Sequence, residues 1–552
     1  MRIERIKSRP FRLRKLRSQF ERQIFAVPKL QREFVWNPRK ACQLLDSVFR
    51  NYPVGSAMIW RARRKQQFAL TSQRHILPPY GDHNAQIWFV IDGQQRLSVL
   101  WQLLRGSGHE VKTQRRQTID FSKFYFYVGP TEQATPFVYR KRAPAENHVA
   151  VVDLLSSRWR SRLGHLGKRA FIRAAECRER ILNYELWLTF IDGSNLDDVQ
   201  ETFIRINSLG TPVAAADKAF ARATSLDLRN SVRAVQDRLG QGFANVREQP
   251  ILTAIALALG AGDIGDRANE LMIRRAERDQ SERRRFEKVW KDLSKAVPYA
   301  VDYMSSNFGV SNYAALPSDY LLTMLSLFFL YRRNRRPSRT QRKALRRWFW
   351  STIVGSRYTG RGYRPNLLAD ARMMKRLAMT GRVNQPALER QPERILYSTD
   401  YRRRGMLPLG LFCLLRTQCP RYLEDGEVIP GRELAAAGNR HDKHHIFPKH
   451  ALNRCGISAT SVNALTNICF LVARENQRVG SSLPRTYLQD VPQGRRHVAA
   501  TLASHLIPSG AEAGLHETNT KRGFRMFTQA RSRLLARAFE REAGVRLFDR
   551  NR

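Results

Sequence analysis

The chain has 552 residues, which is enough for about three domains with sizeable cores. Its 96 lysines and arginines against 48 aspartates and glutamates give a net charge of +48, which favours a nucleic-acid partner over a membrane surface, because no basic amphipathic helix dominates the sequence. Six cysteines exclude a disulfide framework and fit a reducing cytoplasm, the N-terminus lacks an apolar leader, and the longest apolar run, residues 321–330, is too short to cross a bilayer.

Residues 1–225 are predicted to form a small α/β sheet domain. Four short apolar and aromatic runs are the strand candidates, at residues 57–60, 87–91, 124–128 and 185–191. Residues 129–147 contain proline and many polar side chains and are predicted to be a loop. A helical pattern that begins at Asp217 leads out of the sheet domain.

The clearest local pattern in this domain is Asp-Gly-Gln-Gln-Arg at residues 92–96, between a predicted strand and a predicted helix. A turn of this kind exposes main-chain N–H groups at a helix N-terminus, where an anion such as phosphate is favoured. The residues expected to contact a nucleotide there are Asp92, Gly93, Gln94, Gln95 and Arg96. From the residues alone, an ordinary helix capped by Asp92 explains the pattern equally well.

Residues 226–400 are predicted to be helical. Residues 251–259 are apolar all round and are expected to form a buried helix, as is the long apolar run at residues 321–330. Residues 274–291 carry dense charge of both signs and are expected to form one helix with a solvated face. Two clusters of one sign are candidates for contacts with the DNA backbone, although solvated loops would look the same. These candidates are Arg332, Arg333, Arg335 and Arg336, and then Arg402, Arg403 and Arg404.

Residues 401–552 contain the segment Asp-Lys-His-His-Ile-Phe-Pro at 442–448, followed by Asn467 and Asn476. Phosphodiester hydrolysis needs an activated water and stabilisation of developing charge, which a neutral imidazole and a hard divalent cation supply. A structural zinc site is disfavoured, because the cysteines of this region are not paired at short spacing. Helices are predicted at residues 495–506 and 523–543, the second ending at Gly544.

The histidine segment resembles the ββα-metal fold of HNH endonucleases. The resemblance implies that His445 is the general base and that His444 binds the metal, Mg²⁺ or Mn²⁺. It further implies that Asn467 braces His445 through a hydrogen bond and that Asn476, on the closing helix, is the second metal ligand. The choice among Asn463, Asn467 and Asn476 depends on where that helix begins. His441 and His450 are expected to be bystanders.

Further segments resemble, in a single order, fused GmrSD-type modification-dependent restriction proteins. They lie at residues 28–36, 46–56, 92–96, 203–212, 348–350, 357–358 and 484–488. The resemblance implies an α+β multidomain protein with a ParB/sulfiredoxin-like α/β N-terminal domain, a helical middle region, and a C-terminal ββα-metal (HNH) nuclease unit embedded in helices. It adds Gln31 and Arg32 to the nucleotide contacts.

The resemblance implies an anti-phage DNA endonuclease of the prokaryotic cytoplasm. Its N-terminal domain would bind or hydrolyse a nucleoside triphosphate of unknown identity and gate metal-dependent cleavage of double-stranded DNA, including modified phage DNA. A homo-oligomer is compatible with it. Two other functions stay open: a DNA-binding regulator or sensor with a vestigial catalytic site, and an RNA-directed HNH effector. The intact residues His444, His445, Asn467 and Asn476 argue against a vestigial nuclease.

Overall fold

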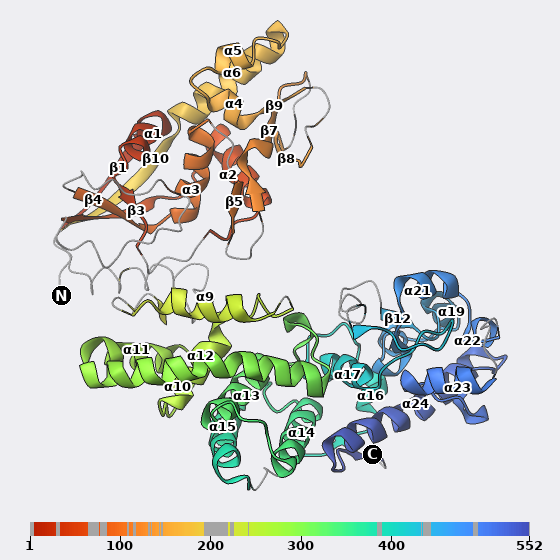
Figure 1. Cartoon of the computed structure of the whole chain (residues 1–552). Helices are drawn as coiled ribbons and strands as arrows, with labels where there is room; N and C mark the ends of the chain where they lie inside the picture. Colours follow the sequence, from red (N-terminus) through yellow and green to blue (C-terminus); the bar gives the residue numbers. More distant parts are fainter. Residues whose placement is uncertain are drawn as a thin grey trace. The chain divides into compact units, whose positions relative to one another are not determined.

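A computed structural model gives the structure of the chain, which divides into two compact units, Met1–Leu228 and Arg229–Arg552 (Figure 1). The described residues are 5–28, 34–63, 77, 86–106, 110–113, 118–130, 133, 135–142, 144, 147–192, 202, 219–220, 223, 226–240, 242–360, 362–383, 389–431, 433, 443–489 and 495–550. The predicted contacts Gln31 and Arg32, the helix start at Asp217 and the segment 203–212 lie outside these residues. The helical middle region and the histidine segment belong to the same unit.

A mixed five-stranded sheet lies at the centre of the first unit. Its strands, in spatial order, are β1 (Arg5–Arg12), β10 (Glu185–Asp192), β3 (Ala57–Arg63), β4 (Gln86–Asp92) and β2 (Phe25–Ala26). β10 pairs antiparallel with β1 and parallel with β3, and β4 pairs antiparallel with β3 and parallel with β2. The predicted strands at residues 57–60, 87–91 and 185–191 are confirmed, and with them the mixed α/β character of this domain. Its likeness to ParB and sulfiredoxin stays a prediction.

Helices and two smaller sheets complete this unit. The helices are α1 (Leu13–Glu21), α2 (Pro38–Phe49), α3 (Gln94–Leu104), α4 (Val151–Leu155), α5 (Trp159–Arg162), α6 (Lys168–Asn183) and the 3-10 helix η2 (Phe121–Lys123). The smaller sheets pair β5 (Glu110–Lys112) with β6 (Thr118–Asp120), and β7 (Phe124–Tyr127) with β8 (Phe137–Tyr139) and β9 (His148–Ala150). The loop predicted at residues 129–147 is therefore wrong at β8. There Phe137 packs on Phe126 at 5.1 Å between ring centroids, and this contact holds a strand among polar neighbours.

The first part of the second unit is a helical assembly around a mostly apolar helix. Its helices are α9 (Leu228–Arg238), α10 (Glu248–Ala258), α11 (Asp266–Arg278), α12 (Gln280–Phe308), the 3-10 helix η3 (Tyr313–Ala315), α13 (Asp319–Tyr331), α14 (Arg339–Val354) and α15 (Tyr363–Thr380). α13 is buried along most of its length and contacts α10, α12 and α15, as its uniform apolarity predicts. The single helix predicted at residues 274–291 is wrong. Asp279 ends α11 and caps α12, because its side chain accepts hydrogen bonds from the N–H groups of Ser281 and Glu282.

The second part of this unit carries the histidine segment between short elements. They are β11 (Gln391–Pro392), α16 (Ile395–Ser398), α17 (Met406–Thr417), β12 (Lys443–His445), α19 (Lys449–Arg454), α20 (Ala459–Val462), the 3-10 helix η4 (Leu465–Asn467), β13 (Ile468–Phe470), α21 (Ala473–Val479), α22 (Pro484–Tyr487), α23 (Arg495–Ser504), the 3-10 helix η5 (Ala511–Ala513), α24 (Thr520–Ala543) and β14 (Phe548–Asp549). The predicted C-terminal helices are confirmed, including the end of α24 at Gly544, whose φ of 68° is left-handed. α24 packs on α14 through Phe539 and Trp350, so the two parts share one core.

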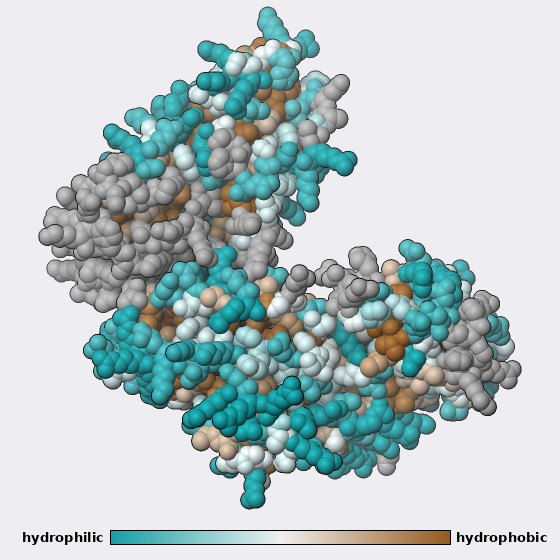
Figure 2. Space-filling model, in the orientation of Figure 1, coloured by the Kyte–Doolittle hydropathy of each residue, from teal (hydrophilic) through white to brown (hydrophobic). Residues whose placement is uncertain are grey.

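Hydrophilic residues cover most of the visible face of the second unit, as a chain with this charge requires (Figure 2). Within the described residues, we find no helix that combines the length and the apolarity needed to cross a membrane.

Candidate functional site

Two short strands hold the adjacent histidines against two separate asparagines. β12 pairs antiparallel with β13, so that His444 lies opposite Cys469 and His445 opposite Ile468. Consecutive residues of a strand point to opposite sides, which gives each imidazole its own partner. His444 Nδ1 lies 2.8 Å from Asn476 Oδ1 on α21, and His445 Nε2 lies 3.1 Å from Asn463 Oδ1. The sequence candidates His444, His445 and Asn476 are thus brought together by β12, β13 and α21.

The hydrogen bonds around His445 define which of its nitrogens carries the proton. Asn463 Nδ2 donates to the Ala459 carbonyl at 2.7 Å, so Asn463 Oδ1 faces the imidazole and accepts from Nε2–H. His445 Nδ1 therefore keeps its lone pair. Burial lowers the pKa of His445 to about 4, outweighing the bond to Asn463, and the positive charge of Lys449 lowers it further. At neutral pH the imidazole is uncharged and able to accept a proton.

His444 is more deeply enclosed than its neighbour. Burial lowers the pKa of His444, while the bond to Asn476 raises it. Its Nε2 is buried and has no hydrogen-bond partner within the described part of the chain. The described residues contain no group of three or more His, Cys, Asp or Glu side chains that could hold a metal. His444 Nδ1 and Asn476 Oδ1 are the adjacent pair of atoms that could ligate a metal. Two ligands are too few for a structural zinc site, so a cation held here would take its other ligands from water and substrate.

Asn467 is corrected from a brace of His445 to a clamp of the following turn. Its side chain is fully buried, and its Oδ1 accepts from the Phe447 N–H at 2.9 Å. Its Nδ2 donates to the carbonyls of Phe447 at 3.1 Å and Val462 at 2.9 Å. These three bonds leave the amide no role at the imidazole. Asn463, four residues earlier and left open by the sequence, holds His445 instead.

Two residues missed by the sequence interpretation fix this turn from outside. Arg531 of α24 is fully buried and donates to the carbonyls of Thr466 at 2.8 Å, Leu506 at 3.0 Å and His505 at 3.1 Å. Burial lowers its pKa to about 10, so it remains charged at neutral pH. Tyr487 donates its hydroxyl to the Ile446 carbonyl at 3.2 Å, directly after His445.

A sequence signal existed for both residues. Arg531 falls four residues after Phe527 and four before Leu535, on the apolar face of its helix, where a charge must be buried. Tyr487 belongs to the segment 484–488 that carries the family resemblance.

The Asp92–Arg96 turn joins β4 to α3 through Gly93, whose φ of 83° is left-handed. Arg96 Nη1 donates to the Val54 carbonyl at 2.6 Å, and Nη2 donates to Asp92 at 3.2 Å. Gln94 and Gln95 are buried, and Gln95 Oε1 accepts from the Val35 N–H at 2.9 Å. Asp92 does not cap α3, because Gly93 occupies the cap position. The described motif side chains thus tie the turn to residues 35 and 54, and the nucleotide contacts stay a prediction.

The two basic clusters lie beyond opposite ends of α13. Arg332, Arg333, Arg335 and Arg336 follow its C-terminus, with all but Arg332 exposed. Arg402, Arg403 and Arg404 are exposed and line a pocket together with Asp319 and Tyr320, at the N-terminus of α13. A helix rises about 1.5 Å per residue, so roughly 18 Å of α13 separates the clusters. They are two surfaces rather than one patch.

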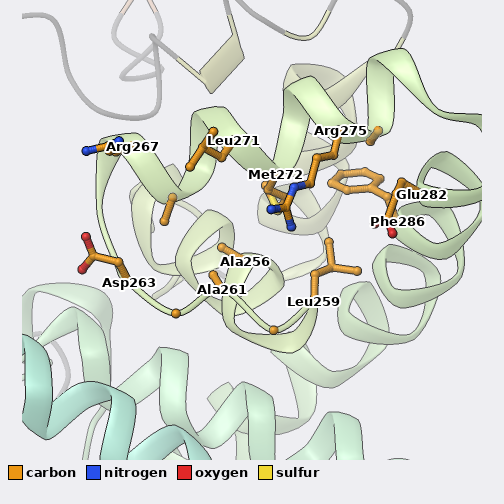
Figure 3. A pocket seen from close by; sticks show the side chains of 14 residues that line it. Ala256, Leu259, Ala261, Asp263, Arg267, Leu271, Met272, Arg275, Glu282 and Phe286 are labelled. Atoms are coloured by element: carbon orange, nitrogen blue, oxygen red, sulfur yellow. The ribbon is translucent and has the colours of Figure 1, made fainter.

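A separate cavity of about 450 Å³ lies among α10, α11 and α12 (Figure 3). Ala256, Leu259, Met272 and Phe286 give it an apolar wall, and Arg275 extends over it. Its lining also includes Asp263, Arg267 and Glu282, and Glu282 forms an ion pair with Arg285 at 3.6 Å. It shares no lining residue with the histidine site.

The fold and the site define a mixed α+β protein with a buried histidine beside a half-buried one, the second of which is suited to proton transfer. Residues 13–223 match the family model described as the N-terminal domain of the GmrSD restriction endonuclease. This part of the chain is therefore similar to that domain, and the resemblance seen in the sequence is confirmed for it. No curated protein matches the chain.

Proposed function

We propose that the chain is a DNA endonuclease of the modification-dependent restriction class, in which an HNH-type site around His444 and His445 cuts the phosphodiester bond. The N-terminal match names a restriction endonuclease, and DNA is the substrate that this class implies. The observation that carries the cleavage proposal is the pairing of His445 with Asn463 and of His444 with Asn476 on β12, β13 and α21.

His445 acts as the general base in this proposal. Its Nε2–H is held by Asn463, so Nδ1 takes the proton from the attacking water. Burial keeps the ring uncharged before the reaction, and a phosphate that enters beside it would stabilise the imidazolium formed when it accepts that proton.

His444 and Asn476 are the residues that would hold a divalent cation, Mg²⁺ or Mn²⁺. When bound, such a cation stabilises the charge on the phosphate and the leaving oxygen. An in-line displacement places the water and the leaving oxygen on opposite sides of phosphorus. Separate partners for the two histidines are compatible with that division of roles.

The N-terminal unit is proposed to bind a nucleoside triphosphate at the Asp92–Arg96 turn and to gate cleavage. A nuclease with a net charge of +48 binds any DNA, so its cutting must be controlled. The start of α3 is where phosphate is favoured, and the left-handed Gly93 lets the main chain turn into this helix while packing closely against Ala57.

The test is metal-dependent cleavage of plasmid and modified phage DNA by the full chain, with and without nucleoside triphosphates. We expect His445→Ala to lower the cleavage rate roughly 10²–10⁴-fold while DNA binding stays near wild type. His450→Ala is the matched control, because His450 is an exposed histidine on neighbouring α19. We expect His444→Ala to lose cleavage through weaker metal binding, so that raising Mn²⁺ partly restores it.

If the cleavage rate of His445→Ala stays within about tenfold of the wild-type rate, the decrease is too small for the loss of a general base, and the assignment of His445 is refuted. Identical metal titrations for His444→Ala and His445→Ala would refute the division of roles. Cleavage of RNA but not DNA would replace the proposal with an RNA-directed effector.

A further inference from the structure

A basic groove adjoins the histidine site within the second unit. It has a volume of about 930 Å³ and lies among the start of α10, the segment that leads into α13, and the segment that leads into α17. Its charged and aromatic lining consists of Arg247, Tyr320, Tyr401, Arg402, Arg403 and Arg404, with Asp319 as its carboxylate. Three segments that are distant in sequence thus gather arginine and tyrosine side chains in one hollow.

Tyr401 connects this groove to the proposed base. Tyr401 lines the groove, and its ring meets the His445 ring edge-on, with 5.7 Å between centroids. Its main-chain N–H donates to the Asn463 carbonyl at 2.9 Å, and Asn463 is the residue that orients His445. The segment that forms this wall of the groove is therefore hydrogen-bonded to the residue that orients the imidazole.

The arginines of the groove exceed the carboxylates that neutralise them. Asp400 binds Arg402 through both oxygens, and Asp319 forms an ion pair with Arg247. Arg403 and Arg404 are exposed, and their side chains make no hydrogen bond or ion pair in the part of the chain that the structure describes. Four guanidinium groups against two carboxylates leave two positive charges that face solvent.

The segment that carries these arginines is already ordered. Arg402 donates from its main-chain N–H, its Nε and its Nη2 to Asp400, and Asp400 itself pairs with Ala464 in a β-bridge. Presenting Arg403 and Arg404 from a fixed segment lowers the entropy lost on binding. A polyanion that also offers flat bases fits a groove lined by two free guanidinium groups and by tyrosines.

We propose that this groove binds the DNA strand beside the scissile phosphate, with Arg403 and Arg404 on its phosphates and Tyr401 guiding the strand to His445. The proposal rests on the proposed function of the histidine site and adds where its substrate lies. DNA, with one charge per phosphate, is the occupant favoured by the excess charge and by the contact between Tyr401 and His445.

The test measures affinity and cleavage separately with the full chain. In an His445→Ala background, we measure binding of a labelled DNA duplex by fluorescence anisotropy between 50 and 200 mM salt, for Arg403→Ser/Arg404→Ser and for a control pair. The control is Arg267→Ser/Arg275→Ser, which removes the same charge from exposed arginines of the cavity among α10, α11 and α12. The two cavities are at opposite ends of α10, roughly 15 Å apart along its axis.

We expect the groove pair to weaken DNA binding on the order of tenfold and to lower the slope of log Kd against log salt by about 2. The control pair should change both much less, and Arg403→Lys/Arg404→Lys should keep most of the slope. In active protein, cleavage by the groove pair should fall at low DNA and recover at saturating DNA.

Equal losses for the groove and control pairs would overturn the groove proposal, because they would reflect net charge alone. A groove pair that loses affinity for an RNA duplex but not for DNA would overturn it too. These binding outcomes do not depend on catalysis. If the wild type binds through the groove but cuts nothing, the nuclease proposal fails while the groove stands.

Discussion

Two asparagines close together in the sequence have opposite tasks around His445. Asn463 accepts a hydrogen bond from the imidazole, whereas the side-chain amide of Asn467 forms its three hydrogen bonds with the main chain of residues 447 and 462. The first orients the imidazole that we propose as the general base, and the second holds the shape of the turn that follows it. Substitution should therefore separate a catalytic defect from a folding defect.

We expect Asn463→Ala to lower cleavage by about 10–100-fold, the usual cost of losing a partner that orients a site histidine. Asn463→Asp keeps an acceptor for Nε2–H and should retain more activity. Asn467→Ala should instead lower the melting temperature, because buried main-chain groups lose their partners at about 1–3 kcal/mol each. Cleavage rates measured well below the melting temperature, together with thermal unfolding curves, check both. A larger loss of stability in Asn463→Ala than in Asn467→Ala would contradict this assignment.

At the scale of elements, the sequence predicts what local pattern determines and misses what distant contacts determine. The composition of residues 321–330 is enough to predict the apolar helix α13, and Gly544 alone is enough to predict the end of α24. The split at Asp279 is a local cap hidden in a charged run. Asn463 could not be chosen over Asn467, because the choice depends on how η4 turns between α20 and β13. Arg531 acts from 65 residues away, through Thr466.

The region between α23 and α24 should make stability depend on pH. His505 Nε2–H donates to the Arg421 carbonyl at 2.7 Å, and the carbonyl of His505 accepts from the buried Arg531. Burial lowers the pKa of His505 to about 4, from the ordinary value of 6.5. The unfolded chain then binds the proton more tightly than the folded chain, so stability is present above pH 6.5 and is lost as the pH falls toward 4.

We expect His505 to contribute about 3 kcal/mol to this loss across the full window. His505→Gln keeps a donor for the Arg421 carbonyl but cannot titrate, so its melting temperature should fall less between pH 7 and pH 5 than that of the wild type. His516→Gln, at an exposed histidine, is the control and should follow the wild type. If the melting temperatures of all three proteins fall equally between pH 7 and pH 5, the prediction is contradicted, because protonation of His505 then does not distinguish the folded state from the unfolded state.

The whole molecule combines a sheet unit similar to a known restriction domain with a helical unit that holds the histidine site. The sequence anticipated the first relationship from motifs spread along the chain. The structure adds that hydrogen bonds fix the Asp92–Arg96 turn to other parts of the sheet unit. Arg96 donates to the Val54 carbonyl, and Gln95 accepts from the Val35 N–H. A ligand at this turn would therefore act on contacts that also stabilise the domain.

If nucleotide binding gates cleavage, Arg96→Ala should weaken nucleotide affinity and remove the effect of nucleotide on DNA cleavage. It should also lower the melting temperature, because the Val54 carbonyl loses its donor. Arg96→Lys, which keeps the charge, separates the two effects. Calorimetric titration of the full chain with each nucleoside triphosphate is the measurement. If Arg96→Ala lowers the melting temperature but leaves nucleotide affinity unchanged, Arg96 only stabilises the fold and the proposed nucleotide contact is wrong.

The reach of Arg531 into the turn behind His445 also sets an order of events during synthesis. The residues of β12 and β13 leave the ribosome long before α24, and until α24 arrives the carbonyls of Thr466, His505 and Leu506 lack their shared cation. The geometry around the histidines is therefore completed only when α24 has formed, because Arg531 lies 65 residues after Thr466. A polypeptide that ends before α24 would carry every proposed catalytic side chain and still lack this support, so the proposed nuclease activity would begin only after α24 has formed.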